Sequence, residues 1–201
     1  MNIQLVDIFR PFLGKLTWRR SSSSKVIYLT FDDGPVPEVT PLVLDLLDKY
    51  NVKATFFCVG ENVRKYPELY KEILRRGHRT GNHTFNHIKG FNVPTSEYVA
   101  NVDKAAEYID SKLFRPPYGR IKRNQIRKLK SRYEIIMWDL LTFDYSQKME
   151  KEAIMNRVKH QSRNGSIVVF HDSLKAKNNM LSVLPLAIEF WNSKDYTFEL
   201  L

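Results

Sequence analysis

The sequence predicts an α/β fold in which parallel strands curl into a closed or nearly closed barrel. Short runs of β-branched and aromatic residues alternate with longer helical patterns from Lys25 onward. About seven such units follow one another, and this number favours a barrel over a flat, doubly wound sheet. No glycine-rich phosphate fingerprint of the dinucleotide or P-loop kind occurs in the sequence.

The predicted strands are short runs, and several of them are dense in branched and aromatic side chains, such as VIYLTF and SIVVF. In chain order the strands are Val26–Phe31, Lys53–Val59, Arg79–Asn82, a stub at Leu113–Phe114, Tyr133–Trp138, Ser166–Phe170 and Tyr196–Leu200. Helical periodicity predicts the segments between them as Glu38–Tyr50, Pro67–Arg76, Ser96–Ser111, Lys122–Lys130, Glu150–Gln161 and Leu181–Ser193. Regular alternation of strand and helix implies parallel pairing with right-handed crossovers.

The chain has 201 residues, of which 43% are hydrophobic and 27% charged, as expected for one globular domain. Ser21–Ser24 read as a linker, so we expect an N-terminal arm over residues 1–24 and the folded domain over 25–201. Asp7 interrupts the only apolar run near the N-terminus, and the first basic residue, Arg10, comes after it. We therefore expect neither a cleavable signal peptide nor a membrane span, with the cytoplasm as the default location and an amphipathic peripheral anchor as the alternative.

The net charge of +10 is concentrated in Arg120–Arg132, a segment without any acidic residue. Ile121, Ile126 and Leu129 predict a helix with one apolar side there. A solvated basic face is the favoured interpretation, and weak association with an anionic surface is the alternative. No aromatic residue interleaves the run, so nucleic acid is not an expected partner. The single cysteine, Cys58, excludes an internal disulfide.

Chemically capable side chains follow the ends of five predicted strands, where the active sites of parallel barrels lie. They are Asp32 and Asp33, His83 and His87, Arg115 and Tyr118, Asp139 and Asp144, and His171. Because the carboxyl ends of parallel strands share one rim, we expect these residues to converge. Asp139 is the exception, since structural support is its favoured role.

Two histidines and a carboxylate predict a metal site on this rim. His83 and His87 are four residues apart, so one helical turn would present both imidazoles to the same side. Together with an aspartate from a neighbouring strand end, they form the ligand set of catalytic zinc sites that keep a position open for water. Successive residues at a strand end point in different directions, so one of Asp32 and Asp33 can bind metal while the other faces the substrate.

Five segments in order, TFDDGP, ATFFCVG, GHRTGNHTFNH, RPPYG and IVVFHDS, resemble the successive motifs of the polysaccharide deacetylase family, carbohydrate esterase family four. The resemblance covers the chain from about Val26 to the C-terminus. It implies a distorted, partly open (β/α)7 barrel that resembles a TIM barrel. It also implies metal-dependent hydrolysis of N-acetyl groups from an amino-sugar-containing polysaccharide or oligosaccharide.

The resemblance further implies roles for residues in the matching motifs. Asp33, His83 and His87 would bind one divalent metal ion, usually zinc, with cobalt or another divalent ion in some members. Asp32 would be the general base, and His171 would be the general acid.

Supporting roles follow from the same resemblance. Arg115 would orient the base carboxylate, the backbone N–H of Tyr118 would help to bind the oxyanion, and Asp144 would support the catalytic histidine. The sequence departs from the family pattern at Tyr145, where many members have tryptophan beside the acetyl pocket. The connection Ile109–Phe114 is also short, which trims the rim near the site and bears on the length of the substrate.

Three other functions are weighed against N-deacetylation. A related metal-dependent hydrolase of cyclic amides or imides would share the strand ends, and a non-catalytic carbohydrate-binding protein could share the fold. The presence of both Asp32 and His171 favours an enzyme over a binding protein. An anion-binding module built on the basic helix would show salt-sensitive binding that ignores metal chelation.

Overall fold

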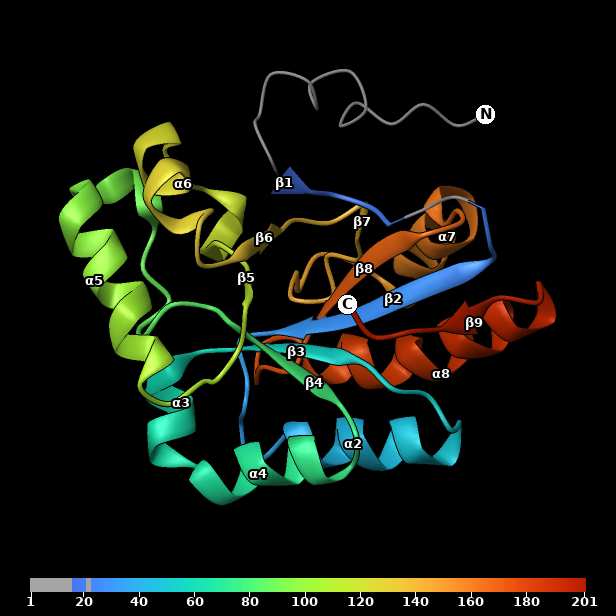
Figure 1. The fold of residues 1–201 in the computed structure, drawn as a ribbon. Helices are drawn as coiled ribbons and strands as arrows, with labels where there is room; N and C mark the ends of the chain where they lie inside the picture. The colour runs from blue at the N-terminus through green and yellow to red at the C-terminus, as the bar shows by residue number, and fades with distance from the viewer. Residues whose placement is uncertain (1–15, 21–22) are drawn as a thin grey trace.

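The computed structural model describes residues 16–20 and 23–201, and within them the strands form one sheet that curls into an open half-barrel (Figure 1). The strands are β1 (Leu16–Thr17), β2 (Val26–Asp32), β3 (Thr55–Cys58), β4 (Arg79–Asn82), β5 (Leu113–Phe114), β6 (Glu134–Ile136), β7 (Leu140–Leu141), β8 (Ser166–His171) and β9 (Thr197–Phe198). Their order is β1-β6-β5-β4-β3-β2-β8-β7, with β9 also paired to β2, and every pair of named strands is parallel. The two strands at the ends of this order, β1 and β7, do not pair with each other within the described residues, so the barrel is open there. The prediction of a distorted, partly open α/β barrel is confirmed.

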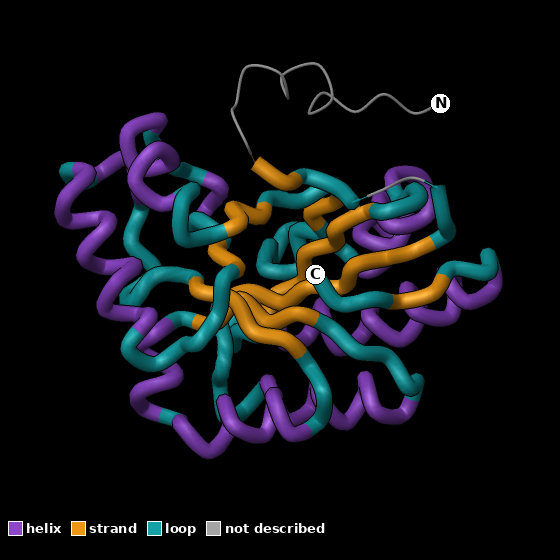
Figure 2. The backbone as a smooth tube through the Cα atoms, viewed as in Figure 1, coloured by secondary structure: helices purple, strands orange, loops and turns teal. Residues whose placement is uncertain are grey.

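Helices cover the outside of the curled sheet (Figure 2). They are α2 (Thr40–Lys49), α3 (Gly60–Lys65), α4 (Pro67–Arg75), α5 (Thr95–Ala106), α6 (Arg123–Leu129), α7 (Lys151–Gln161) and α8 (Lys177–Ser193), and 3-10 turns lie at Gly90–Asn92 and Pro117–Gly119. Neighbouring helices touch in the pairs α7–α8, α8–α2, α2–α4, α4–α3, α3–α5 and α5–α6, so they form a continuous outer layer. Helices bury the outer face of the central strands, and side chains inside the barrel bury the inner face. Burial on both faces explains why these strands are nearly continuous apolar runs.

The core lies on both faces of the central strands β2 and β8. Ile27, Leu29 and Phe31 of β2 are fully buried in the layer between sheet and helices. Phe57 and Ile167 point instead into a second cluster, which the C-terminal Leu201 joins. This packing fixes the register of β2 against β8, and the register decides which residues meet at the rim.

Three short elements lie outside the sequence predictions. Two of them, β1 and β7, are only two residues long, so neither carries a readable alternation. The third, α3, begins at Gly60 and has no side-chain cap, so no start signal marks it. The last helix, α8, begins at Lys177, one turn before the apolar pattern that predicts it.

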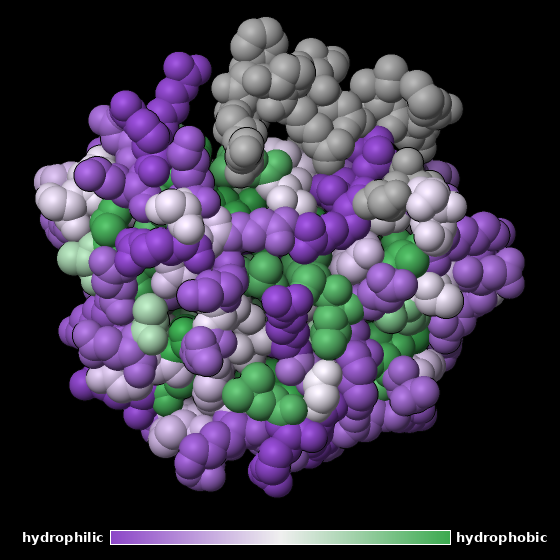
Figure 3. All heavy atoms as spheres, in the orientation of Figure 1, coloured by the Kyte–Doolittle hydropathy of each residue, from purple (hydrophilic) through white to green (hydrophobic). Residues whose placement is uncertain are grey.

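The basic segment is an amphipathic helix, as predicted. Gln125 and Leu129 of α6 are buried against the core, whereas Arg123, Arg127 and Lys128 face solvent. Figure 3 shows that hydrophilic side chains dominate the face seen in Figure 1, with hydrophobic groups confined to small patches. Among the described residues, no helix combines the length and apolar character that a membrane crossing requires.

Candidate functional site

The predicted polar residues meet in one pocket at the carboxyl ends of the strands. The β2–β8 register places Asp32 directly beside His171, and the β4–β5 pairing places Asn82 beside Phe114, one residue before His83 and Arg115. The pocket has a volume of about 530 Å³. Its walls include predicted site residues from the ends of five strands, namely Asp32, Asp33, His83, His87, Tyr118, Tyr145 and His171.

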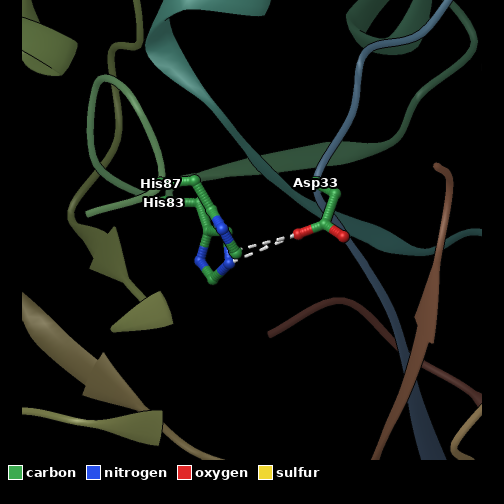
Figure 4. A group of neighbouring side chains, drawn as sticks. All are labelled: Asp33, His83 and His87. Carbon is green, nitrogen blue, oxygen red and sulfur yellow. Dashed lines mark ion pairs between the residues drawn. The ribbon is translucent and has the colours of Figure 1, made fainter. Parts of the chain in front are cut away.

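Asp33, His83 and His87 form a compact cluster whose side chains point toward one another (Figure 4). Asp33 comes from the loop after β2, and both histidines come from the loop after β4. One ligand atom from each residue lies within 4.8 Å of the others. The Nε2 atoms of His83 and His87 lie 3.8 Å and 3.2 Å from Asp33 Oδ1, so all three side chains aim at one point.

The chemistry of these donors fits a divalent metal ion. His83 Nδ1 donates a hydrogen bond to the carbonyl oxygen of Arg115 at 2.8 Å, which leaves Nε2 as the free lone pair. Burial lowers the pKa of His83 to about 4, against the opposing charge of Asp32, so this imidazole is neutral at physiological pH. Burial raises the pKa of Asp33, but the hydrogen bond from His87 and the nearby histidine charges outweigh it and hold the pKa below its usual range. Two imidazoles and one carboxylate match an open catalytic zinc site.

The histidine pair lies on an irregular loop, so the prediction of a helical turn over HTFNH is wrong. Thr84 and His87 have φ of 65° and 58°, in the left-handed region, and these values rule out a regular turn of helix. The imidazoles still come within 5.1 Å of each other, measured between ring centroids. Asp33 has φ of 85°, and Tyr118 has φ of 59°. Such backbone strain persists only where the surroundings enforce it, and it commonly gathers at functional sites.

A buried ion pair joins Asp32 to Arg115. Arg115 Nη1 lies 2.6 Å from Asp32 Oδ1 and also donates to the Thr30 hydroxyl at 2.8 Å. The guanidinium stacks on the ring of Phe57, with its central carbon 4.0 Å from the ring centroid, and it is fully buried. Burial lowers the pKa of Arg115 and the Asp32 charge opposes that change. The arginine therefore fixes the position of one carboxylate oxygen and leaves the other for the pocket.

A second ion pair joins Asp144 to His171, and His171 lines the pocket. Asp144 is fully buried and accepts two hydrogen bonds from His171, from Nδ1 at 2.7 Å and from the backbone N–H at 2.8 Å. Burial lowers the pKa of His171, but Asp144 offsets this effect, and with the charges of Asp33 and Asp32 it raises the pKa to about 9. The imidazole is thus held protonated with Nε2 directed away from Asp144. The ring of Tyr145 packs edge-on against it, with centroids 4.8 Å apart.

Tyr118 lies at the mouth of the pocket, and its side chain is half exposed. Its hydroxyl lies 3.1 Å from His87 Nδ1. No described residue accepts a hydrogen bond from the backbone N–H of Tyr118, whereas the next two N–H groups bond to the carbonyls of Pro116 and Pro117. This N–H is therefore available to an oxygen in the pocket.

Asp172 is a site neighbour that sequence reasoning did not single out. Its backbone N–H donates to the Asp32 carbonyl at 3.0 Å, and its carboxylate accepts from the Gly34 N–H at 3.0 Å. The carboxylate also accepts from the Thr40 hydroxyl at 2.7 Å. These contacts clamp the chain on both sides of Asp33. The only sequence signal is the acidic residue directly after His171 in IVVFHDS.

Asp139 lies away from the pocket, as its favoured structural role predicts. Its carboxylate bonds to Arg163 and to the hydroxyl of Ser166, the first residue of β8. Ser166 lies at the amino end of that strand, whereas the site lies at the carboxyl end. Asp139 therefore stabilises the opposite end of the barrel through these hydrogen bonds.

Comparisons with known proteins find similar sequences and similar folds. The family model described as polysaccharide deacetylase matches residues 19–135. A peptidoglycan-N-acetylglucosamine deacetylase of Bacillus cereus is 32% identical over 193 residues, which are 92% of this chain and 90% of that protein. A chitooligosaccharide deacetylase of Azorhizobium caulinodans is 32% identical over 77% of each chain.

Two further similarities place the chain among longer relatives and solved folds. Another peptidoglycan-N-acetylglucosamine deacetylase of Bacillus cereus is 38% identical over 73% of this chain, and the match spans only 56% of that relative. The crystal structure of a peptidoglycan N-acetylglucosamine deacetylase in complex with an N-hydroxybenzamide compound superposes with a TM-score of 0.90. That structure is 31% identical, and the superposition covers 98% of this chain and 95% of the other.

Proposed function

The chain belongs to the polysaccharide deacetylase family, and from that premise we propose that it hydrolyses N-acetyl groups of an amino-sugar-containing polysaccharide or oligosaccharide in a metal-dependent reaction. The catalytic domain in this proposal is residues 25–201, and residues 1–24 would be an arm that adds β1 to the edge of the sheet. One observation carries the proposal. A two-histidine, one-carboxylate cluster lies in the same pocket as an arginine-held carboxylate and an aspartate-held histidine.

Asp33, His83 and His87 would hold the ion, with zinc as the first choice because neutral imidazole and carboxylate suit it. When bound there, such an ion supplies Lewis acidity and lowers the pKa of a water molecule. The hydrogen bond from His83 Nδ1 to the Arg115 carbonyl would keep that ring in the ligating tautomer. Cobalt or another divalent ion could take the same donors.

Asp32 would accept the proton of the attacking water as the new C–O bond forms. Arg115 would hold its carboxylate through the 2.6 Å contact, so that the base reaches the pocket in one orientation. The carbonyl oxygen becomes an oxyanion during attack, and the Tyr118 N–H would donate to it. Removing one such donor typically raises the barrier by about 3–4 kcal/mol.

His171 would then protonate the departing amine as the C–N bond breaks, releasing acetate and a free amino sugar. Its pKa of about 9, with Asp144 accepting from Nδ1, keeps the proton on the ring at neutral pH. Tyr145 would wall the acetyl pocket beside His171. Because tyrosine carries a hydroxyl where many family members have an indole, this wall differs in shape and polarity.

The experiment is acetate release from N-acetylated sugars by Asp32→Asn and His171→Ala. Both variants should lose release by several orders of magnitude while retaining most of their metal affinity, because neither side chain belongs to the ligand set. Wild-type rates in either purified variant would refute the assigned roles. Activity on a cyclic imide but on no acetylated sugar would support the related amide and imide hydrolases instead.

A further inference from the structure

The solvent side of α6 is made almost wholly of cations. Arg123, Arg127 and Lys130 are exposed and follow one another at spacings of four and three residues, so their side chains lie on one side of the helix. Lys128 is exposed beside them, and the other exposed positions of residues 123–131 are an asparagine and a serine. These four cations are called the basic face below.

The opposite side of α6 holds the basic face in a fixed position. Leu129 is fully buried in a cluster with residues of α5, β5 and β6. The buried side chain of Gln125 accepts from the Lys122 backbone N–H and donates to the Gly90 carbonyl, each at 2.8 Å. Because packing already uses the apolar side of the helix, α6 can bind a partner through the charges of its outer side.

The basic face has no acidic partner in the part of the chain that the structure describes. None of its four cations forms an ion pair with a described carboxylate, whereas cations of other helices do. In α3, Glu61 pairs with Arg64 and with Lys65, and α4 has pairs at the same spacings. The neighbouring α5 offers Asp103, but its carboxylate is engaged with Arg132 at 2.6 Å. The positive charge of α6 is therefore not balanced locally.

This arrangement costs helix stability unless an anion binds. Arg123 and Arg127 are four residues apart, and Arg127 and Lys130 are three apart. Like charges at these spacings repel each other and destabilise a helix. An anionic partner would replace that repulsion by attraction. Two of the four cations are arginines, whose paired N–H donors match the oxygens of a phosphate group. Phosphate is therefore the anion that suits the basic face best.

An exposed aromatic side chain lies on the turn that packs against the start of α6. Phe91 is 53% exposed and belongs to the 3-10 turn Gly90–Asn92. A Cβ atom at Gly90 would lie 2.6 Å from the Arg120 carbonyl oxygen and 2.7 Å from Gln125 Oε1, so the turn is close against the helix. Cations beside an exposed apolar ring are typical of proteins that rest on a membrane surface. A single ring does not make the row of aromatic side chains on which single-stranded nucleic acids stack.

We propose that the basic face and Phe91 dock the protein on a membrane surface rich in anionic phosphate headgroups. This inference does not depend on the proposed deacetylase reaction, and it adds the surface on which the protein would work. Arg120, which precedes α6, also lines the catalytic pocket. Docking through the basic face would therefore bring the mouth of the pocket close to the plane of the membrane.

The test measures co-sedimentation of the full chain with lipid vesicles. One set of vesicles is phosphatidylcholine alone, and the other contains about 30% phosphatidylglycerol, which adds a negative surface potential. The protein should bind the anionic vesicles and not the neutral ones at about 50 mM salt, and binding should weaken at about 500 mM salt because the charges are screened.

A triple variant connects binding to α6. Each cation close to an anionic membrane typically raises the affinity about fivefold, so Arg123→Gln/Arg127→Gln/Lys130→Gln should bind the anionic vesicles roughly 100-fold more weakly. Its thermal melt and its zinc affinity should match those of the wild type, because the three side chains are exposed and lie outside the catalytic pocket.

A matched control separates the basic face from the net charge of the protein. Lys49→Gln/Lys159→Gln/Lys194→Gln removes the same number of charges from exposed positions of α2, of α7 and of the end of α8. The outer layer of helices has α6 at one end and these three helices toward the other (Figure 1). This variant should bind anionic vesicles nearly as well as the wild type does.

The Phe91→Ser variant and two soluble polyanions separate a membrane from other phosphate-bearing partners. Phe91→Ser should bind anionic vesicles more weakly but inorganic polyphosphate equally well, because only the membrane offers an apolar layer for the ring. At equal phosphate concentration, polyphosphate and a double-stranded oligonucleotide should both bind more weakly than the anionic vesicles.

Four results would overturn the inference while leaving the deacetylase proposal untouched. The first is equal binding to neutral and anionic vesicles, or to neither. The second is an equal loss of binding in the two triple variants, which would assign the attraction to net charge alone. The third is unchanged vesicle binding by Phe91→Ser. The fourth is tighter binding of a soluble polyanion than of anionic vesicles, which would make a free phosphate polymer the partner instead.

Discussion

Replacement of Asp144 by asparagine should move the alkaline limb of the pH–rate profile to lower pH. Asp144 is fully buried and accepts from both His171 Nδ1 and the His171 backbone N–H. Asparagine has nearly the same shape but no charge. Without that carboxylate, burial is the dominant influence on His171, and burial lowers the pKa of a histidine.

The expected size of the effect follows from the two protonation states. The pKa of His171 is about 9 in the protein, and in the variant it should fall to the ordinary value of 6.5 or below. At about pH 8 the protonated fraction would then drop from roughly 90% to roughly 3%, a loss of about 30-fold in rate. The loss should become smaller as the pH falls toward about 6, because the proposed acid is again protonated there.

The assay is acetate release between about pH 5.5 and pH 9.5 with saturating metal, together with a thermal melt of each protein. Asp195→Asn is the control, since Asp195 is an exposed acid paired with Lys25 at 3.4 Å, and its profile should match the wild type. A folded Asp144→Asn protein with an unshifted alkaline limb would refute the assignment of His171 as the acid that Asp144 holds protonated.

Further expectations concern the support of the site and the acid stability of the fold. Gly34→Ala should weaken zinc binding about 10- to 100-fold in a calorimetric titration, because the added Cβ would lie 1.9 Å from Asp172 Oδ2 and displace the loop that carries Asp33; undiminished affinity would count against this. Thr40→Val should lower the free energy of unfolding by about 1–3 kcal/mol in a urea titration, because it removes the hydroxyl that Asp172 needs. Burial lowers the pKa of His78 to about 4 from 6.5, so its neutral form stabilises the fold above pH 6.5 and this stability is lost as pH falls toward 4. His78→Asn retains an acceptor for the Ala54 N–H and should lose less stability than the wild type between those pH values. An equal loss of stability in the two proteins would contradict the predicted direction of the pH dependence.

The long central strands of the fold are readable from the sequence, whereas its shortest elements are not. Val26–Phe31 and Ser166–Phe170 are predicted to within one residue, because strands buried on both faces are unbroken apolar runs. By contrast, β7 has two residues, and only its pairing with β8 defines it. Those short elements are defined by tertiary contacts, so no local sequence pattern predicts them.

The candidate site likewise has features that the sequence predicts and features that it does not. Polar residues after strand ends point to one rim, and the structure does bring Asp33, His83 and His87 within 4.8 Å. The path of the chain between the histidines could not be predicted, since left-handed φ at His87 follows from its surroundings rather than from its residue type. Asp172 could not be singled out either, because its partners, Gly34 and Thr40, are more than 130 residues away in the sequence.

The central claim is a metal-dependent loss of acetyl groups from an amino sugar, and one measurement tests it most directly. Purified protein is incubated with N-acetylated oligosaccharides before chelation, after chelation, and after zinc or cobalt is restored, and both acetate and free amine are quantified. The proposal predicts equal amounts of acetate and amine, loss of both on chelation, and recovery on addition of metal. Release of acetate that continues unchanged in the chelated protein, or that no metal restores, would contradict it.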